Sequence, residues 1–346
     1  MMDKRLNKFG EELGRFLEYY NININEFAQR IGTTSKNLID IIEGRVALSF
    51  NMICNISFIS EISVDYIFNV EESFKIDNNI DEFLKDNNIT LKKYLNKFNF
   101  KELHEKYGVN IRNERDDYTI FEDIFKYLRI IDPKLIYKED NHIFYKSNND
   151  KPELLALWLE RCYRVVQNQE LKEYKKDNID KLVEFIRNEA RNYRFNKEKL
   201  IKEFNDNGIF LAIEPDLKGA KIRGAFRVLN NKPAIYITPK YKRYGDIYFA
   251  LLHELAHCKS DYNRAKKGSI VSLENHKSKE DYEIKADRTA YNWMVNDKIY
   301  ESIKLNKVFD EKSEVPCFVV YRLTQDKLIN YNSSLYQEYN KLINID

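Results

Sequence analysis

The stretch DIYFALLHELAHCKS, from Asp246 to Ser260, constrains the fold more than any other part of the chain. Its apolar residues recur at helical spacing, which predicts a buried helix. His253 and His257 are four residues apart on this helix, so both imidazoles should project from one face. Because unpartnered histidines in a buried helix would be costly, the pair is expected to bind something, and a metal ion suits this geometry.

The residue between these histidines makes the pattern more specific. Two imidazole nitrogens one turn apart suit a tetrahedral Zn²⁺ ion, which in catalytic sites takes three protein ligands and keeps one open position. Glu254, rotated by about 100° around the helix, can reach a water molecule in that position. HELAH therefore has the form of the HExxH motif of zinc metallopeptidases, with Glu254 as general base. The alternative is a pair of surface histidines on an ordinary core helix.

A second amphipathic helix, EDYEIKADRTAYNWMV at residues 280–295, offers the missing third ligand. Glu283 and Asp287 are one turn apart on it. Glu283 is the expected ligand, and Asp287 is expected to accept a hydrogen bond from the far ring nitrogen of a metal-bound histidine. Glu280 and His276 are competing third ligands, and a solvated charged face is the alternative interpretation.

Length and composition favour a multidomain protein that is neither secreted nor inserted in a membrane. The chain has 346 residues, 32% of them charged, and a formal net charge of +2, so two or three domains without a dominant charge are expected. No apolar run approaches 18 residues, and the start MMDKRLNKFGEELGRF carries charges throughout. We therefore expect a cytoplasmic protein. Its four scattered cysteines favour free thiols over disulfides.

Residues 5–70 are predicted to form a series of short helices. Asn25 is expected to cap the second of them, Gly32 to end it, and Thr34 or Ser35 to cap the third. Two brief helices separated by a glycine-containing turn form a helix-turn-helix.

This pair, NEFAQRIGTTSKNLIDIIEGR, resembles the Cro/repressor-type helix-turn-helix family. The resemblance implies that the second helix enters the major groove of DNA. The residues then nearest the DNA are Thr34, Ser35, Lys36 and Asn37, with Arg45 near a phosphate. The first 70 residues carry seven basic and nine acidic side chains, a net charge of −2, whereas DNA-binding domains are usually basic. The alternative is a helix-turn-helix that serves dimerisation or protein binding.

The rest of the chain divides at about residue 140. Residues 71–140 are expected to form a helical connector. Beyond it, Pro152 should begin a long helix, and two further helices should end at Gly208. Three strand-like runs, IFLAIEP, AKIRGAFRV and PAIYITP, then predict a small antiparallel sheet that leads into the HELAH helix. An extended peptide could be held at its edge by strand addition.

Taken together, HELAH, EIKAD, the preceding LLALWLERC helix and the three strands resemble the ImmA/IrrE family of metallopeptidases over residues 142–346. The resemblance implies a zinc-dependent endopeptidase that cleaves a specific transcriptional repressor. A repressor-type helix-turn-helix ahead of such a domain is a known arrangement, including among HigA-like antitoxins and prophage regulators. This chain departs from the usual pattern at Arg288 and Thr289, where a bulky apolar residue often precedes the alanine.

The expected architecture is therefore an all-α helix-turn-helix domain (1–70), a connector (71–140) and an α+β, zincin-like metallopeptidase domain (141–346). The expected partners are a protein substrate, which is an intracellular regulator or the connector itself, DNA and a second copy of the chain. Tyr282, Tyr291, His276 and Arg288 are all conceivable stabilisers of the oxyanion. The alternative function is a DNA-binding repressor or antitoxin whose peptidase-like domain senses or binds a partner.

Overall fold

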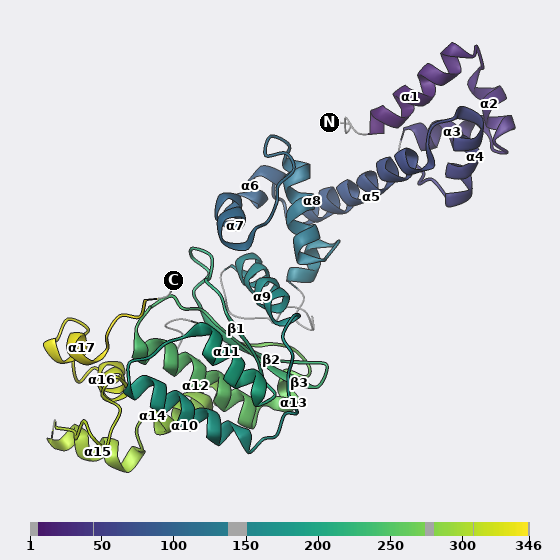
Figure 1. Ribbon diagram of the computed structural model, residues 1–346. Coiled ribbons are helices and arrows are strands. Elements are labelled where there is room, and N and C mark those ends of the chain that lie inside the picture. Colours follow the sequence, from purple (N-terminus) through teal and green to yellow (C-terminus); the bar gives the residue numbers. More distant parts are fainter. Residues whose placement is uncertain (1–5, 44, 138–150, 274–279, 307, 345–346) are drawn as a thin grey trace. The chain divides into compact units, whose positions relative to one another are not determined.

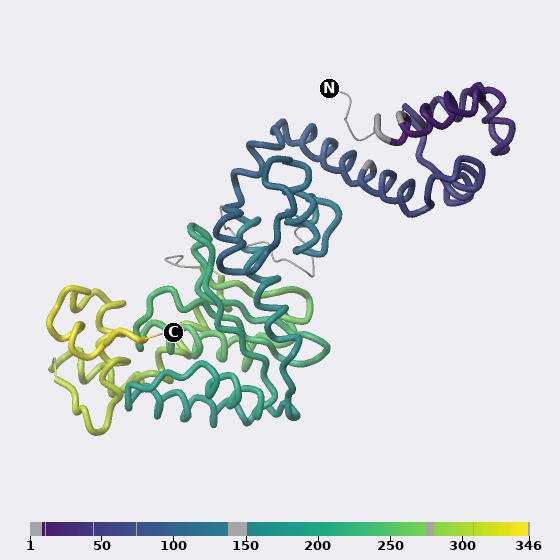
Figure 2. The backbone as a smooth tube through the Cα atoms, turned by 45° about the horizontal axis from the view of Figure 1, so that its top comes forward, coloured from purple at the N-terminus to yellow at the C-terminus, as the bar shows by residue number. Residues whose placement is uncertain are grey.

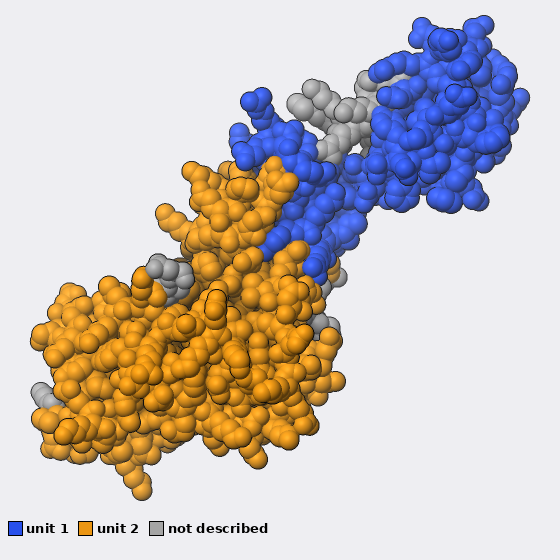
Figure 3. Space-filling model, in the orientation of Figure 1, with its two compact units in different colours: residues 1–95, 112–133 blue, residues 96–111, 134–346 orange. Residues whose placement is uncertain are grey.

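A computed structural model describes residues 6–43, 45–137, 151–273, 280–306 and 308–344. The chain divides into two compact units (Figure 3). The helical unit comprises residues 1–95 and 112–133, and the α+β unit comprises residues 96–111 and 134–346. The segment expected to be a connector is thus shared between the two units. No helix in the described ranges is long and apolar enough to cross a membrane.

The helical unit contains the predicted helix-turn-helix. Its helices are labelled in Figure 1 and are α1 (Leu6–Tyr19), α2 (Ile24–Arg30), α3 (Ser35–Ile42), α4 (Phe50–Ser60), α5 (Val64–Asp86), α6 (Leu91–Leu95) and α8 (Asp117–Leu128). Phe27 of α2, Leu38 of α3, Ile56 of α4 and Ile67 of α5 are fully buried together in one apolar core. This core holds the two short helices in place, because helices of seven and eight residues are marginal by themselves. Helix α5 continues through residue 70, so the predicted boundary falls inside a helix.

The caps of the helix pair agree with the sequence prediction for one helix and not for the other. Thr34 caps α3, and its Oγ accepts a hydrogen bond from the backbone N–H of Asn37 at 3.2 Å. The prediction for α2 was wrong, because its cap is Asn23, whose Oδ1 accepts from the N–H of Glu26 at 2.9 Å. Asparagine alternates with isoleucine in this stretch, so residue type alone does not identify the cap. The spacing from Asn23 to Glu26 is that of a capping box and would have identified it.

The α+β unit is built on one four-stranded sheet. Its elements are α7 (Phe100–Tyr107), α9 (Pro152–Val166), α10 (Asn178–Arg191), α11 (Lys197–Asp206), β1 (Phe210–Ile213), β2 (Ile222–Leu229), β3 (Lys232–Ile237), α12 (Tyr244–Ser260), α13 (Tyr262–Ala265), β4 (Ile270–Leu273), α14 (Asp281–Met294), α15 (Asp297–Asn306), α16 (Pro316–Gln325) and α17 (Ser334–Tyr339). The three helices predicted between Pro152 and Gly208 are confirmed as α9, α10 and α11. Helices α15, α16 and α17, at the yellow end of the colour scale, gather at one side of the unit (Figures 1 and 2).

The sheet is mixed, so the prediction of an antiparallel sheet was wrong. Its strand order is β1-β3-β2-β4. Strands β2 and β3 form an antiparallel hairpin through Asn230 and Asn231, whose φ angles of 48° and 62° match a two-residue type I′ turn. Strand β1 pairs in parallel with β3 rather than with β2, the next strand in the chain. Strand β4, which was not predicted, adds to the free side of β2.

Helix α12 is the central element of the α+β unit. It packs against β2, β3, α10, α14 and α16. All its residues from Tyr244 to Cys258 except Asp246 are buried, which confirms the predicted buried helix. A helix surrounded on all sides is apolar almost all round. Its polar side chains therefore need specific partners inside the protein.

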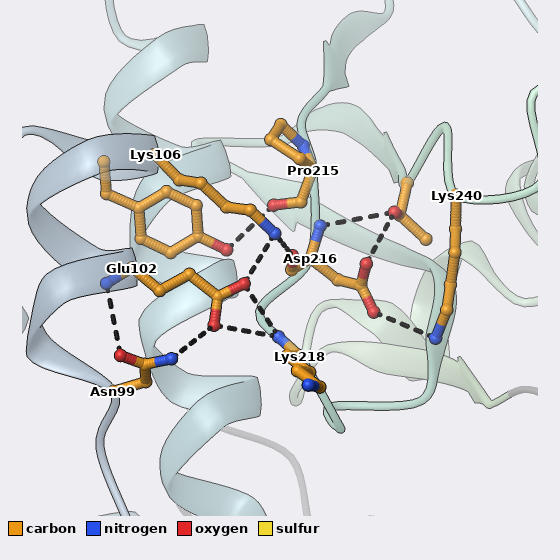
Figure 4. Close-up of polar contacts among 9 residues, drawn as sticks. Asn99, Glu102, Lys106, Pro215, Asp216, Lys218 and Lys240 are labelled. Atoms are coloured by element: carbon orange, nitrogen blue, oxygen red, sulfur yellow. Dashed lines mark hydrogen bonds and ion pairs between the residues drawn. The ribbon is translucent and has the colours of Figure 1, made fainter.

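Helix α7 belongs to this unit through polar contacts with the loop that joins β1 and β2 (Figure 4). Tyr107 donates a hydrogen bond to the carbonyl of Pro215 at 2.9 Å, and Lys106 donates to the carbonyl of Asp216 at 2.7 Å. Glu102 accepts from the backbone N–H of Lys218 at 3.0 Å and forms an ion pair with Lys106. The loop is thus fixed by a helix that precedes it by more than 100 residues.

Gly208 follows α11 with a φ of +80°, and a Cβ there would lie 2.4 Å from the Cα of Tyr174. We expect Gly208→Ala to lower the free energy of unfolding of the α+β unit by about 2 kcal/mol or more. The left-handed conformation costs a non-glycine residue about 1–2 kcal/mol, and the backbone clash adds to this. Urea unfolding followed by tryptophan fluorescence measures this unit alone, since both tryptophans, Trp158 and Trp293, lie in it.

The matched control is Gly219→Ala. Gly219 has a φ of +89°, but a Cβ there would meet the flexible end of Lys151, whose Nζ lies 2.5 Å away. Only the conformational cost of about 1–2 kcal/mol should appear. An equal loss of stability in the two variants would contradict the role given to the Tyr174 backbone.

Candidate functional site

The two histidines of α12 point into one buried site. The Nε2 atoms of His253 and His257 lie 3.0 Å apart. His253 is 2% exposed and His257 is fully buried. Their spacing of four residues on one helix brings the rings together, as the sequence predicts.

Helix α14 brings Glu283 to the same point. Its Oε2 lies 3.3 Å from Nε2 of His253, and its Oε1 lies 3.4 Å from Nε2 of His257. One ligand atom from each of the three residues lies within 4.8 Å of the others, so the group could hold a metal ion. Glu280, the competing ligand, is the N-cap of α14 and is not part of the group. His276, the other competitor, lies outside the described residues.

Each histidine has a carboxylate beside its other ring nitrogen. Asp287 Oδ1 lies 2.8 Å from Nδ1 of His253, the contact predicted from the sequence. Asp261 Oδ2 lies 3.0 Å from Nδ1 of His257, and Asp261 also accepts a hydrogen bond from Ser260. Sequence analysis missed Asp261, although it follows His257 by four residues on the same helical path. A carboxylate at Nδ1 fixes the proton there in a neutral imidazole, so that Nε2 presents its lone pair to the centre.

The electrostatics of the three central groups reflect this convergence. Burial lowers the pKa of His253, but the adjacent carboxylates of Asp287 and Glu283 outweigh it and raise the pKa to about 10. The pKa of His257 is also raised, because Asp261 and Glu283 outweigh the effect of burial. Burial raises the pKa of Glu283, but the two histidines outweigh it and lower the pKa to about 2. The site therefore favours positive charge between these three side chains.

Glu254 lies beside this group with a carboxylate that is fully buried. Neither of its oxygens has a hydrogen-bond partner of good geometry among the described residues. Burial raises its pKa to about 7, against the opposing effect of the two histidines and the nearby Ser272 hydroxyl. A Cβ at Gly224 of β2 would lie 2.5 Å from Oε1 of Glu254, so any larger residue there would displace the Glu254 side chain. Gly224 and Ser272 were not identified from the sequence.

The described residues fit a tetrahedral metal ion. Ligands at about 2.0–2.2 Å from such an ion lie roughly 3.3–3.6 Å from one another. The Nε2 atoms of His253 and His257 lie 3.0 Å apart, and the Glu283 oxygen nearest each of them lies 3.3 Å (Oε2) and 3.4 Å (Oε1) away, respectively. The buried carboxylate of Glu254, without a partner, is a further sign that a polar group belongs beside it. An ion held here by three protein ligands would keep a fourth position for water.

The residues considered as oxyanion stabilisers differ in their surroundings. The ring of Tyr282 lies 6.0 Å from the ring of His257. Tyr291 packs against Phe249 with ring centroids 4.8 Å apart, and burial raises its pKa. Arg288 is exposed. Of these residues, Tyr282 has a ring contact with one of the candidate metal ligands.

Some of the residues predicted to contact DNA are exposed, and others form hydrogen bonds or ion pairs within the helical unit. Thr34 and Lys36 are exposed at the start of α3, and Ser35 is its first residue. Asn37 donates a hydrogen bond from Nδ2 to the hydroxyl of Thr33 at 2.9 Å. Arg45 forms ion pairs with Asp40 and Glu43, so a contact with phosphate would have to compete with these acids.

Comparisons with known proteins add no relative, since no family model, no curated protein and no solved structure matches the chain. Its function must therefore be inferred from its own residues.

The carboxylates at the histidine Nδ1 atoms should strengthen metal binding. We expect Asp261→Asn and Asp287→Asn each to weaken binding of Co²⁺, used as a spectroscopic probe, by about 10- to 100-fold. An amide can still orient the imidazole ring, but it lacks the negative charge that makes the ring a stronger ligand. Chelator competition measures the affinity. Asp281→Asn, at an exposed position in the first turn of α14, is the control and should leave the affinity unchanged. Equal affinities in all three variants would show that neither carboxylate supports a ligand.

Proposed function

We propose that this chain is a zinc-dependent endopeptidase with a regulatory helix-turn-helix, of the kind that its resemblance to the ImmA/IrrE family implies. The observation that carries the proposal is the buried group of His253, His257 and Glu283 with the unpartnered carboxylate of Glu254 beside it. In the proposed assignment the α+β unit is a zincin-like metallopeptidase domain. Two imidazoles and one carboxylate are a ligand set of catalytic zinc sites with an open position.

Each side chain has a defined part in the proposed mechanism. Zinc, when bound, polarises the scissile carbonyl and makes its water molecule more acidic. His253, His257 and Glu283 hold the ion, while Asp287 and Asp261 keep the two Nε2 atoms unprotonated. Glu254 accepts the proton of the attacking water at its carboxylate and later delivers that proton to the leaving amine. Burial of Glu254 excludes bulk water from this transfer.

The substrate that suits this arrangement is a protein regulator. The chain combines the site with a helix pair that resembles transcriptional repressors, so we propose limited cleavage of one intracellular regulator or of residues 71–140 of the chain itself. Proteins encoded beside this chain are the first candidates. Intact-mass measurement after co-incubation would identify the cleaved bond, whereas broad digestion of unfolded casein would contradict a narrow substrate choice.

Glu254→Gln separates metal binding from catalysis. The variant should keep zinc and lose cleavage by about 10²- to 10⁴-fold, because an amide cannot take the proton. Glu283→Gln should instead lose most of the metal, because it removes a charged ligand. Zinc content by elemental analysis and cleavage by intact mass are the two measurements.

The control for this pair is Glu280→Gln, which makes the same chemical change at the N-cap of α14, outside the ligand group. It should keep both zinc and cleavage. A Glu254→Gln variant that still cleaves would contradict the assignment of Glu254 as general base.

The second candidate function is a DNA-binding repressor or antitoxin whose peptidase-like domain senses or binds a partner. The observation that favours it is the intact helix pair, with exposed Thr34 and Lys36 at the start of α3. Such a helix start is where repressor-type domains contact DNA. A chain that binds no zinc and cleaves nothing, yet binds its operator, would favour this function over the first.

Lys36→Ala tests the DNA contact. If α3 enters the major groove, the variant should weaken operator binding by about 1–3 kcal/mol and leave the fold intact. A gel shift with the DNA upstream of the chain's own coding sequence measures the change. Lys85→Ala, which removes an equal charge near the end of α5, is the control. Absence of any sequence-dependent shift at moderate salt would leave the helix pair as a protein-docking module.

A further inference from the structure

A pocket of about 500 Å³ lies in the α+β unit beside the candidate metal centre. Its walls include Ile222 and Arg223 of β2, Asp246 and Ala250 of α12, and Tyr321 of α16. This volume is in the range of sites that bind small molecules or single side chains. None of the metal ligands lines the pocket, and the mechanism above gives it no part.

The pocket and the metal centre share one face of α12. The helix residues that line the pocket are Asp246, Ile247 and Ala250, and they precede His253, Glu254 and His257 by seven residues each. Seven residues are close to two helical turns, or about 10 Å along the axis. An extended peptide advances by about 3.3 Å per residue. A peptide cleaved at the metal centre would thus bring a side chain about three residues from the scissile bond to this pocket.

Strand β2 connects the same two places through a β-bulge. Ile222 pairs with Leu273 and Gly224 pairs with Ser272, which are consecutive residues of β4. Arg223 is therefore an extra residue in β2 that has no partner in β4. Bulges of this kind redirect a side chain. Gly224 faces Glu254, and the Arg223 guanidinium lies 5.1 Å from the centre of the Phe249 ring on the same helix. The bulge therefore turns two consecutive residues of β2 towards α12, one to each site.

Arg223 has hydrogen-bonding capacity that the described residues do not use. Its side chain forms no ion pair or hydrogen bond within the described ranges, and its one close partner is the Phe249 ring. A guanidinium has five N–H donors and binds carboxylates in a bidentate manner. Burial lowers its pKa, but Tyr321, Asp287, Tyr291 and Asp246 outweigh this effect, so it stays charged. An arginine in this state is suited to an incoming anion.

The other charged groups of the pocket are already engaged. Arg243 donates to the carbonyl of Asn340 and, at 2.9 Å, to the side chain of Gln337. Asp246 accepts from Asn340 at 3.1 Å and from Tyr336 at 3.4 Å, and burial raises its pKa. The net formal charge of these three ionisable side chains is positive, from two arginines and one aspartate. The pocket therefore favours a carboxylate over an ammonium group.

We propose that this pocket is the specificity subsite for an aspartate or glutamate side chain of the cleaved protein, with Arg223 as the residue that binds its carboxylate. This assignment rests on the proposed peptidase function. It predicts a cleavage site with an acidic residue within three positions of the scissile bond. Arg223 acts here on the substrate side chain and takes no part in bond cleavage.

Binding to the full-length, metal-free protein decides the proposal without any need for catalysis. The probe is N-acetylglutamate α-amide, and its neutral isostere N-acetylglutamine α-amide is the matched comparison. We expect the glutamate probe to bind about tenfold more tightly or better, as charge-assisted hydrogen bonds require. Saturation-transfer nuclear magnetic resonance detects such weak binding. Equal binding of the two probes would overturn the proposal.

Three variants assign the effect to Arg223. Arg223→Gln should abolish the preference for the glutamate probe, and Arg223→Lys should keep part of it because the charge remains. Arg227→Gln, on the same strand with its guanidinium over the Tyr163 ring, should keep all of it. Tryptophan fluorescence checks that each variant is folded. An Arg223→Gln variant that retains the preference, or an Arg223→Lys variant that folds and shows none, would overturn the assignment.

Cleavage of a randomised peptide library by the zinc-loaded protein then tests the link to catalysis. Acidic residues should be enriched within three positions of the cleaved bonds, and Arg223→Gln should remove the enrichment. Cleavage without such enrichment would overturn the subsite while leaving the peptidase intact. If no peptide is cleaved, the proposed peptidase function fails, and the binding measurement still decides whether the carboxylate site exists.

Discussion

The convergence of two imidazole nitrogens and one carboxylate at 3.0–3.4 Å is the interaction on which the α+β unit depends. Two Nε2 lone pairs at this distance repel each other unless a positive charge lies between them. In the metal-free protein protons can supply that charge, and the carboxylates of Asp287 and Glu283 raise the pKa of His253 to about 10 against the effect of burial. A divalent cation would meet the same demand and release those protons. The site is thus arranged for a cation before any function is assigned to it.

The scaffold keeps the ligands in place by anchoring α12 at its start. Asn340, which is fully buried, accepts a hydrogen bond from the N–H of Gly245 at 2.7 Å and donates to Asp246 at 3.1 Å. A Cβ at Gly245 would lie 2.8 Å from the Cβ of Tyr321. The backbone at the start of α12 therefore packs directly against α16. Gly224 provides the same close approach between β2 and Glu254. The site therefore depends on contacts between segments far apart in sequence.

The sequence correctly predicted the features that depend on residues a few positions apart in the chain. The pairs His253 with His257 and Glu283 with Asp287 each span one helical turn, so their spacing carried the geometry. The strand order could not be predicted in this way, because the order of the strands along the chain does not show that β1 pairs with β3 rather than with β2. Arg223 was also missed, since a bulge depends on the register against β4, a strand that was itself not predicted. The candidate metal ligands could be predicted from the sequence, whereas the neighbouring pocket could be recognised only from the fold.

The extent of the α+β unit follows from where the buried polar groups find partners. Residues 96–111 belong to it because α7 satisfies backbone groups of the loop after β1, through Tyr107 to Pro215 and Glu102 to Lys218. That loop also carries Asp216, which bonds to Thr238 beside β3, and its far end enters β2 at Ile222, next to Arg223. Leaving such carbonyl and N–H groups without partners costs about 1–3 kcal/mol each. A boundary drawn at residue 140 would remove α7 and so loosen the loop that leads into the pocket.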